Sequence, residues 1–360
     1  MKLTIFVGGL SGGGTERVVC NLANYLVSKG HIIEIITMSD DEPSYVLSDQ
    51  VNRIILLRKQ ERKNFVVNSF LRFFHLRQYI KHSDTDGYLA MLTVSILLLL
   101  GLHHCIKVPI LVSERGDPNS NSIIAKYLLK RLAKYGDGFV FQTEDAEKWY
   151  NHCIEGKPRR IIFNAINEDA LCNGCNPNQR EKKIVAVGRL FHAKNFAMLI
   201  NAFSIVHKKY NDYSLIIYGE GALRLDLENE VRQLFLEDYV FLPGYISNVS
   251  DKINNASLFV LSSDCEGIPN ALIEAMALGI PCISTDCPVG GPRYLISNGQ
   301  NGILTPVGDV DSLANAMINL LDNPEYAEQL GQNAMLIRKQ LDPIKIYSEW
   351  EEFISEILMT

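Results

Sequence analysis

Two glutamates eight positions apart, Glu266 and Glu274, are the most informative carboxylates in this chain. Between them stands Pro269, whose fixed φ suits the first position of a helix. The sequence therefore predicts a strand over 258–261, a short loop that carries Glu266, and a helix over 269–278 that carries Glu274. Gly279 and the proline two residues beyond it end that helix. Both carboxylates are expected near the start of one helix, next to its amides.

The start of this helix is predicted to bind an anion. Ile268, at the expected N-cap, has no side-chain acceptor, so the amides of Asn270, Ala271 and Leu272 are left uncapped. Uncapped amides at the positive end of a helix dipole attract phosphate, and Gly267 lets the backbone approach a ligand closely. Phosphate on the amides and hydroxyl groups on the two carboxylates would suit a sugar nucleotide.

Two cations follow another expected strand, over 184–187. Arg189 comes directly after Gly188, and Lys194 opens the next helix five residues later. This spacing can clamp a diphosphate around the turn, and a solvated pair of loop charges is the alternative.

Further loops at expected strand ends could contact a nucleotide or its sugar, with simple turn chemistry as the alternative for each. Glycines there let backbone amides approach a ligand. These positions are Gly12, Gly13 and Gly14 before Arg17 in the first turn, Gly219 and Glu220 after the strand over 214–218, and Gly244 after the strand over 239–242.

A second candidate site follows the expected strand over 109–113. Glu114 and Arg115 stand just beyond its end, and charged residues at that edge of a parallel sheet are site candidates. A local ion pair on the loop is the alternative.

Metal chemistry is not predicted. Asp84 and Asp86 form a D-x-D pattern, but they precede a strand and so fall at the wrong edge of the sheet. Cys172 and Cys175 have no second pair at zinc spacing. No cofactor is therefore expected.

The composition is that of a globular protein, with 47% hydrophobic and 21% charged residues. Its 360 residues favour two domains. The longest apolar run, over 92–102, is interrupted by polar residues, too short to span a membrane, and predicted to be a buried helix. The first strand, over 3–7, is not preceded by a signal peptide, so a cytoplasmic location with reduced cysteines is expected.

Strands and helices alternate along both halves of the chain, which predicts parallel sheets covered on both faces. The fold class is α/β, with two doubly wound, Rossmann-like domains facing across a cleft. The expected ranges are an N-terminal acceptor-binding domain over 1–170, a polar linker over 171–183, a donor-binding domain over 184–340, and a C-terminal segment over 341–360 whose residues 343–358 form an amphipathic helix.

Charge is divided unevenly along the chain. Residues 1–165 hold 21 Lys and Arg against 16 Asp and Glu, whereas the whole chain has a net charge of −6. Residues 53–82 are basic and rich in aromatic side chains, which is typical of a helix at an anionic membrane surface. A core-facing helix with a solvated basic face is the alternative. Nucleic acid is not expected as a partner, because the chain as a whole is acidic.

Taken together, the chain resembles the retaining, nucleotide-sugar-dependent glycosyltransferases with the GT-B fold, family 4 type. The resemblance runs from end to end. It is carried by the paired glutamates, the Gly-Arg and Lys-Asn motifs, the glycine loops, Pro288 to Arg293, and Asn301-Gly302.

The resemblance implies a role for each site residue. Arg189 and Lys194 would bind the donor diphosphate and stabilise the leaving group without a metal. Glu274 would bind the ribose hydroxyls, and Glu266 would lie near the transferred sugar. Gly13 and Gly14 would let the N-terminal domain close over donor and acceptor. The final helix would cross back to the N-terminal domain.

The chain departs from this family at one place. Many relatives have a histidine where this chain has Arg115 or its neighbour, and arginine cannot act as a base at neutral pH. Arg115 could instead bind phosphate of the donor or of a lipid-diphosphate acceptor.

The resemblance implies transfer of a hexose or N-acetylhexosamine from a UDP-sugar to a saccharide or polyprenyl-diphosphate-linked acceptor. The product would be a bacterial cell-surface glycan, made on the cytoplasmic face of the membrane. A sugar-nucleotide epimerase and an inactive nucleotide-sugar-binding subunit are the alternatives.

Overall fold

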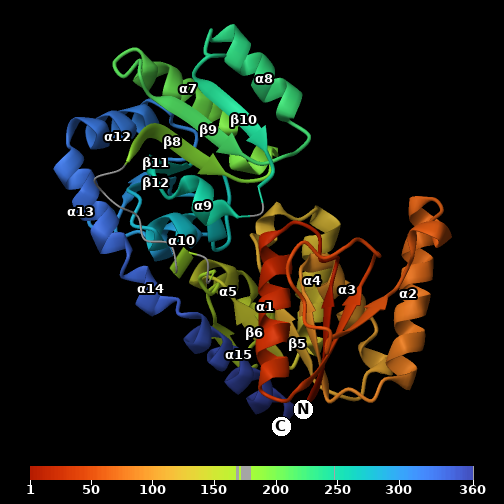
Figure 1. The fold of residues 1–360 in the computed structure, drawn as a ribbon. Coiled ribbons are helices and arrows are strands. Elements are labelled where there is room, and N and C mark those ends of the chain that lie inside the picture. Colours follow the sequence, from red (N-terminus) through yellow and green to blue (C-terminus); the bar gives the residue numbers. More distant parts are fainter. Residues whose placement is uncertain (168–169, 172–179, 247, 360) are drawn as a thin grey trace. The chain divides into compact units, whose positions relative to one another are not determined.

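The computed structural model describes residues 1–167, 170–171, 180–246 and 248–359. The chain forms two compact units (Figure 1), one made of Met1–Ala165 with Ile344–Thr360 and the other of Ile166–Pro343. They are called unit 1 and unit 2 below. The sequence placed the boundary a few residues later, in a linker over 171–183. Most of that linker lies outside the described residues, but β8 already begins at Glu181.

Unit 1 is built on a seven-stranded sheet in the order β3-β2-β1-β4-β5-β6-β7. Neighbouring strands are parallel throughout, so the carboxyl ends of all seven lie at one edge. The strands are β1 Lys2–Val7, β2 Ile32–Thr37, β3 Asn52–Ile55, β4 Gly87–Met91, β5 Ile110–Ser113, β6 Gly138–Phe141 and β7 Arg159–Ile161.

The helices of unit 1 cover both faces of this sheet. The chain moves in one direction from β1 to β3 and then in the other from β3 to β7, and right-handed crossovers place α1 on one face and α2, α3 and α4 on the other. The helices are α1 Gly14–Ser28, α2 Phe65–His82, α3 Thr93–Gly101, α4 Ile123–Leu132 and α5 Glu144–Tyr150.

The last helix, α15, spans Pro343–Leu358, which are the predicted bounds. It packs on unit 1 beside α1, where the rings of Tyr25 and Tyr347 lie 5.5 Å apart. His31 Nε2 lies 2.8 Å from a carboxylate oxygen of Glu351. Trp350 is fully buried, so α15 is part of the core of unit 1.

Unit 2 is built on a six-stranded parallel sheet in the order β10-β9-β8-β11-β12-β13. Its strands are β8 Glu181–Val187, β9 Ser214–Tyr218, β10 Val240–Gly244, β11 Ala256–Leu261, β12 Cys282–Thr285 and β13 Ile303–Thr305. Its helices are α7 Phe196–His207, α8 Arg224–Gln233, α9 Val249–Ile253, α10 Asn270–Ala277, α11 Gly291–Leu295, α12 Val310–Asp322, α13 Pro324–Ala334 and α14 Ile337–Gln340.

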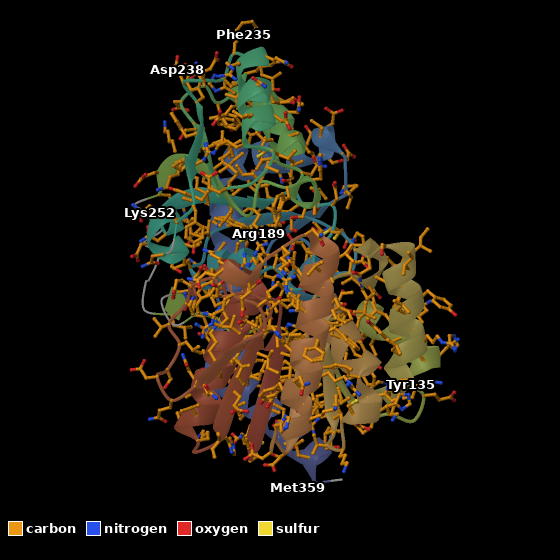
Figure 2. All side chains as sticks on the ribbon, turned by 90° about the vertical axis from the view of Figure 1, so that its right-hand side faces the viewer. Tyr135, Arg189, Phe235, Asp238, Lys252 and Met359 are labelled. Carbon is orange, nitrogen blue, oxygen red and sulfur yellow. The ribbon has the colours of Figure 1, made fainter. Side chains whose placement is uncertain are left out.

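The two edges of the unit 2 sheet are easily told apart. Arg189 follows the carboxyl end of β8, and Asp238 precedes the amino end of β10. Figure 2 shows these two side chains at different ends of the unit. Residues expected to bind a ligand therefore gather at the Arg189 end, the usual position for a site in a parallel sheet.

Backbone-to-backbone packing brings the loops after β8 and β9 together. A Cβ atom on Gly219 would lie 1.8 Å from the Gly188 carbonyl oxygen, and one on Gly221 would lie 2.5 Å from the Leu190 carbonyl oxygen. Gly219 also has φ +149°, which side chains rarely allow. These glycines are needed because the backbone after β9 lies directly against the backbone after β8.

Replacing Gly219 with alanine should destabilise unit 2 strongly. The added methyl group has to displace a backbone carbonyl and hold a strained φ, so we expect a loss of roughly 3 kcal/mol or more in the free energy of unfolding. Denaturant unfolding measures this loss. Gly101→Ala is the control because its added Cβ meets nothing within 4 Å, and equal stability of the two variants would contradict the packing argument.

Candidate functional site

The loop after β8 and the loop after β11 are joined by several hydrogen bonds. The Asp264 amide donates to the Ala193 carbonyl at 2.9 Å, and the Ser262 hydroxyl donates to the Lys194 carbonyl at 2.9 Å. The Asn195 side-chain amide donates to Asp264 Oδ1 at 2.8 Å. These bonds fix the position of Lys194 at the carboxyl edge of the sheet.

Asn195 has a second role in this arrangement. Its φ of 44° places it in the left-handed region, which asparagine tolerates better than most residues. Its side-chain oxygen accepts from the Met198 amide at 3.2 Å and so caps α7. One residue thus turns the chain after Lys194, starts the helix and binds the neighbouring loop.

Lys194 and Glu266 form an ion pair between the two loops. The Ser263 hydroxyl donates to the same carboxylate oxygen, Glu266 Oε1, at 2.6 Å. Both charged side chains are largely buried, at 23% and 13% exposed. An ammonium has three donors, and this contact uses one of them.

The segment after β12 supports Glu266 from the other side. The Glu266 amide donates to the Pro288 carbonyl at 2.7 Å, and the Val289 amide donates to the Glu266 carbonyl at 3.0 Å. A Cβ on Gly291 would lie 1.5 Å from the Gly267 carbonyl oxygen, so glycine is required where the segments meet. The Pro288–Arg293 motif thus holds the glutamate loop in place.

The start of α10 differs from the prediction. Pro269 is the N-cap and the helix begins at Asn270, one residue later than expected. The Leu272 amide donates to the Pro269 carbonyl at 3.1 Å, so the expectation that this amide is uncapped was wrong. The predicted anion site at this helix therefore loses the Leu272 amide. Glu274, one turn further on, is 2% exposed.

Glu220 is paired with a residue that the sequence analysis did not consider. Arg224, one helical turn later, contacts both carboxylate oxygens, at 2.5 and 2.9 Å. The guanidinium holds the pKa of Glu220 below its ordinary value. Gly244 lies beside this pair, since a Cβ there would be 3.0 Å from Glu220 Oε1. Arg189, which follows β8, is an exposed residue.

The glycine turn after β1 leads directly into α1. Gly12 has φ +69°, Gly13 is the N-cap without a side-chain cap, and Gly14 is the first helical residue. The Arg17 amide closes the first helical turn onto the Gly13 carbonyl at 3.1 Å. In unit 1 this turn lies at the same sheet edge as Glu114 and Arg115.

Glu114 and Arg115 are both buried, at 3% and 7% exposed, and they form no ion pair with each other. Glu114 accepts from the Tyr150 hydroxyl at 2.8 Å and from the Arg115 amide at 3.2 Å. Burial raises the pKa of Glu114 to about 7 despite these hydrogen bonds, which favour the charged form.

Arg115 is held from several sides. Its Nη2 donates to Asn164 Oδ1, and its guanidinium lies 5.8 Å from the Trp350 ring of α15. Its Nε and Nη1 are buried without a hydrogen-bond partner among the described residues. The side chain therefore joins the loop after β5 to the end of β7 and to the last helix.

The remaining sequence candidates fall elsewhere. Asp84 forms an ion pair with Lys2, and Asp86 accepts from the Lys2 amide, both at the amino edge of the unit 1 sheet. Within the described ranges no group of three or more His, Cys, Asp or Glu residues could hold a metal ion. Cys172 and Cys175 lie outside the described residues.

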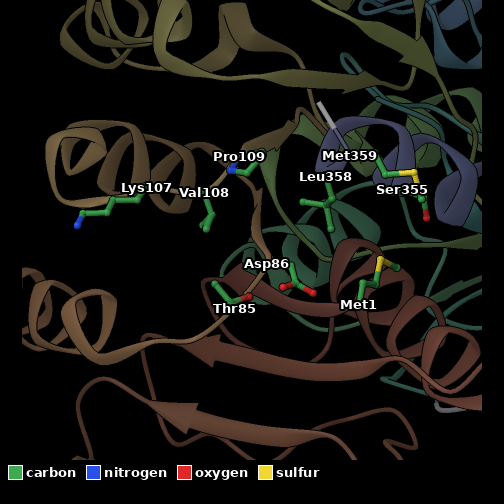
Figure 3. Close-up of a pocket in the computed structure, with 9 residues that line it drawn as sticks. All are labelled: Met1, Thr85, Asp86, Lys107, Val108, Pro109, Ser355, Leu358 and Met359. Atoms are coloured by element: carbon green, nitrogen blue, oxygen red, sulfur yellow. The ribbon is translucent and has the colours of Figure 1, made fainter.

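A pocket of about 420 Å³ in unit 1 also lies away from these groups. Figure 3 shows Thr85, Asp86 and Pro109 lining it together with residues of α15. Because Asp86 and Pro109 precede β4 and β5, the pocket is at the amino ends of the strands. The chemistry-bearing residues are at the other ends.

Comparison with known families agrees with the geometry. Residues 12–170 match the family described as Glycosyltransferase Family 4, and residues 173–336 match Glycosyl transferases group 1. The chain belongs to the GT-B glycosyltransferases of the family 4 type. The predicted family, fold class and enzyme class are therefore confirmed.

Two relatives and one solved structure show how far the similarity extends. An uncharacterized glycosyltransferase of Haemophilus influenzae is 28% identical, with 97% of this chain and 99% of that protein covered. A Campylobacter jejuni α-1,4-N-acetyl-D-galactosaminyltransferase, named for a GalNAc- and diNAcBac-containing diphospho-undecaprenol substrate, is 26% identical over 99% of both chains. Anabaena HepE in complex with UDP and glucose has a TM-score of 0.81 and 15% identity, covering 99% of this chain and 100% of that one.

Several supporting residues were missed by the sequence analysis. They are Ser263, Asp264, Arg224, Tyr150, Asn164 and Trp350, which contact the candidate residues directly. Glu220 and Arg224 are four residues apart on the way into α8, a spacing that could have indicated the pair. Ser263 is three residues from Glu266. The remaining four contact partners that are at least 36 positions away in the chain and carry no local signal.

The buried Glu114 should make stability depend on pH. Its pKa is about 7 in the folded protein against an ordinary value of 4.5, so the folded state holds a proton in this range that the unfolded state has lost. Its contribution to stability is therefore full below pH 4.5 and falls as the pH rises to about 7, by roughly 3 kcal/mol.

Glu114→Gln should remove this dependence. Between pH 5 and pH 8 the unfolding free energy of the wild type should fall relative to that of the variant, as measured by denaturant titrations. The exposed Glu155→Gln variant should follow the wild type. Parallel pH profiles for wild type and Glu114→Gln would contradict the prediction.

Proposed function

We propose that this glycosyltransferase moves a hexose or N-acetylhexosamine from a UDP-sugar to a saccharide or lipid-linked saccharide, with retention of configuration. The observation that supports it most is the Lys194–Glu266 pair, held by Ser263 beside the start of α10. It brings a cation, a carboxylate and helix amides to one sheet edge of unit 2. These are the groups that a diphosphate and a sugar require.

The donor would be bound through its charges. Lys194 has ammonium donors beyond the one directed at Glu266, and Arg189 offers an exposed guanidinium at the same edge. Together they would stabilise the negative charge that develops on the leaving UDP. We propose that this charge compensation requires no metal, so transfer should be unaffected by a chelator such as EDTA.

The sugar and ribose would be bound by the two carboxylates. Glu266 is fixed by contacts to Lys194, Ser263 and the segment after β12, which suits a sugar-side contact of defined position. Glu274 is buried on α10 and is assigned to the ribose hydroxyls. Retention would proceed by attack on the front face of the donor sugar, with a donor phosphate oxygen taking the proton of the acceptor hydroxyl.

The acceptor class is proposed from the relatives. The Campylobacter enzyme is named for a substrate carried on diphospho-undecaprenol, and the described helices of this chain include none long and apolar enough to cross a membrane. We place transfer in the synthesis of a bacterial cell-surface glycan, at the cytoplasmic face of the membrane. Contact with the membrane would involve the basic, aromatic helix α2, which exposes Val66, Phe70, Phe73 and Phe74.

Lys194→Ala should lower kcat by a factor of about 10² to 10³, because a positioned charge at the leaving group is lost. It should also lower the stability of unit 2, because Glu266 is left largely buried without its cation, so the rate is measured at a temperature where thermal unfolding shows the variant to be folded. Release of UDP from a panel of UDP-sugars, with and without acceptor, measures the effect. Lys182→Gln is the matched control, because Lys182 forms its ion pair with Asp212 at the amino edge of the same sheet.

The same assay separates the alternatives. Isomerised sugar nucleotide formed from donor alone would indicate an epimerase, and donor binding without UDP release with any acceptor would indicate an inactive subunit. Turnover of Lys194→Ala at the wild-type rate would overturn the assignment of the leaving-group site.

Glu274→Gln should raise the KM for the donor by roughly tenfold to a hundredfold, since a hydrogen bond to a charged group is lost. The variant keeps the size of the buried side chain, so the fold should be retained. The specific readout is a donor that lacks one ribose hydroxyl. Wild type should discriminate against this deoxy donor, and the variant should not. If the variant discriminates against the deoxy donor as strongly as wild type does, another residue must contact the ribose.

A further inference from the structure

The helix α4 carries an exposed apolar surface that the proposed function does not use. Ile123 and Ile124, in its first turn, are 82% and 73% exposed, and Tyr127 and Leu128 follow on the next turn. Helices of a globular protein normally turn such residues toward the core. Here Leu129 is the only residue of the helix that is fully buried.

This surface extends onto the neighbouring helices of unit 1. The Thr93 hydroxyl contacts Asn121 Oδ1 at 3.0 Å, which ties the start of α3 to the start of α4, and Val94 beside it is also exposed. The helix α2, on the same face of the sheet (Figure 1), exposes Val66 and Phe70 in its first two turns. Each of these three helices, on one face of the sheet, thus has exposed apolar side chains near its start.

The charges on α4 and on the turn that follows it are positive. Residues 123–135 contain Lys126, Lys130, Arg131 and Lys134 and no acidic residue. In the part of the chain that the structure describes, these four make contacts with a carbonyl, a hydroxyl or aromatic rings and none with a carboxylate. Figure 2 shows Tyr135, which follows α4, at the outer edge of unit 1. Lys130, Arg131 and Lys134 are exposed and Lys126 is half-buried, so these cations face outward, and none of them contacts a carboxylate among the described residues.

We propose that the first turns of α3 and α4, bounded by the basic residues of α4, dock unit 1 on an anionic phospholipid bilayer. Apolar side chains on a basic helix enter the boundary between headgroups and acyl chains, while lysine and arginine contact lipid phosphates. A protein partner would more often present acidic residues against the cations and would not require so many exposed isoleucines at one helix end. This proposal specifies where the enzyme contacts the membrane, and it rests on the proposed function, transfer to a lipid-linked acceptor.

The position of this surface fits an acceptor held in the membrane. The helices α3 and α4 begin just after the carboxyl ends of β4 and β5, and Glu114 and Arg115 follow β5 at the same edge. A bilayer in contact with these first turns would bring lipid-linked headgroups to the edge where the acceptor-side residues lie. The four positions Val94, Ile123, Ile124 and Tyr127 thereby become the docking residues, and α2 provides a second point of contact.

The test is binding to vesicles, measured by co-sedimentation. Wild type should bind vesicles of phosphatidylcholine mixed with phosphatidylglycerol, and less so at high salt. The variant Ile123→Ser with Ile124→Ser should bind at least about tenfold more weakly. Both side chains are mostly exposed, so the variant should fold, as thermal unfolding will verify. Leu225→Ser, at a 70% exposed leucine on α8 in unit 2, is the matched control and should bind like wild type.

A second variant tests the charges. Lys130→Gln with Arg131→Gln and Lys134→Gln should lose the dependence on phosphatidylglycerol and on salt, whereas Lys208→Gln with Arg232→Gln and Lys252→Gln in unit 2 should not. Wild type that fails to bind anionic vesicles, or an isoleucine variant that binds as tightly as wild type, would overturn the proposal. Equal binding to neutral and anionic vesicles would overturn the role of the cations.

Activity distinguishes failure of this inference from failure of the proposed function. The isoleucine variant should keep the wild-type rate with a water-soluble saccharide acceptor and lose rate only with a lipid-linked acceptor in vesicles. Vesicle binding without transfer to any acceptor would leave the docking surface in place and reject the proposed reaction. Transfer to lipid-linked acceptor at the wild-type rate by the isoleucine variant would reject the docking surface alone.

Discussion

The contact on which the candidate site of unit 2 depends is the ion pair between Lys194 and Glu266, because it joins the loops after β8 and β11. A pair that is mostly buried contributes only if its geometry is fixed and its remaining hydrogen-bond groups are satisfied. Ser263 donates to the Glu266 carboxylate, and the hydrogen bonds of Asp264, Asn195 and Ser262 fix the geometry by joining the two loops. The glycines of the neighbouring loop make this possible, because side chains at 219 and 221 would push the β8 loop out of place. The position of the charged side chains therefore depends on the close packing of these glycines.

Much of this arrangement could be predicted from sequence, for a definite physical reason. Buried parallel strands are continuous apolar runs, so the six strands predicted by range lie within a few residues of β1, β5, β8, β9, β10 and β11. The strand β13 was missed because it has three residues, of which only Thr305 is buried. The helix after Glu266 was also predicted, although its first residue was placed one position too early. The proline there has the extended backbone of an N-cap, with ψ 108°.

What the sequence does not reveal are the pairings between distant residues. Glu266 pairs with Lys194, which is 72 positions away in the sequence, and Arg115 contacts Trp350 in the last helix. No periodicity or spacing encodes such contacts, since they arise only when strands that are far apart in sequence become neighbours in a sheet. The roles of Glu114 and Arg115 illustrate the consequence. The sequence suggested either a ligand site or a local ion pair, and the structure shows two buried groups held by other residues.

Three glutamates at the carboxyl edges of the two sheets differ in their partners and their burial because their environments differ. Glu266 lies against an ammonium and is held as part of an ion pair. Glu114 is buried against a tyrosine hydroxyl, and its pKa rises to about 7. Glu220 is exposed beside Arg224, which lowers its pKa. A carboxylate that must contact a neutral sugar hydroxyl next to a diphosphate benefits from a permanent cation at its side, because the cation offsets its repulsion from the phosphates. Of the three, only Glu266 combines a cation with a largely buried position, since its side chain is 13% exposed against 51% for Glu220, and this combination favours it as the contact to the transferred sugar.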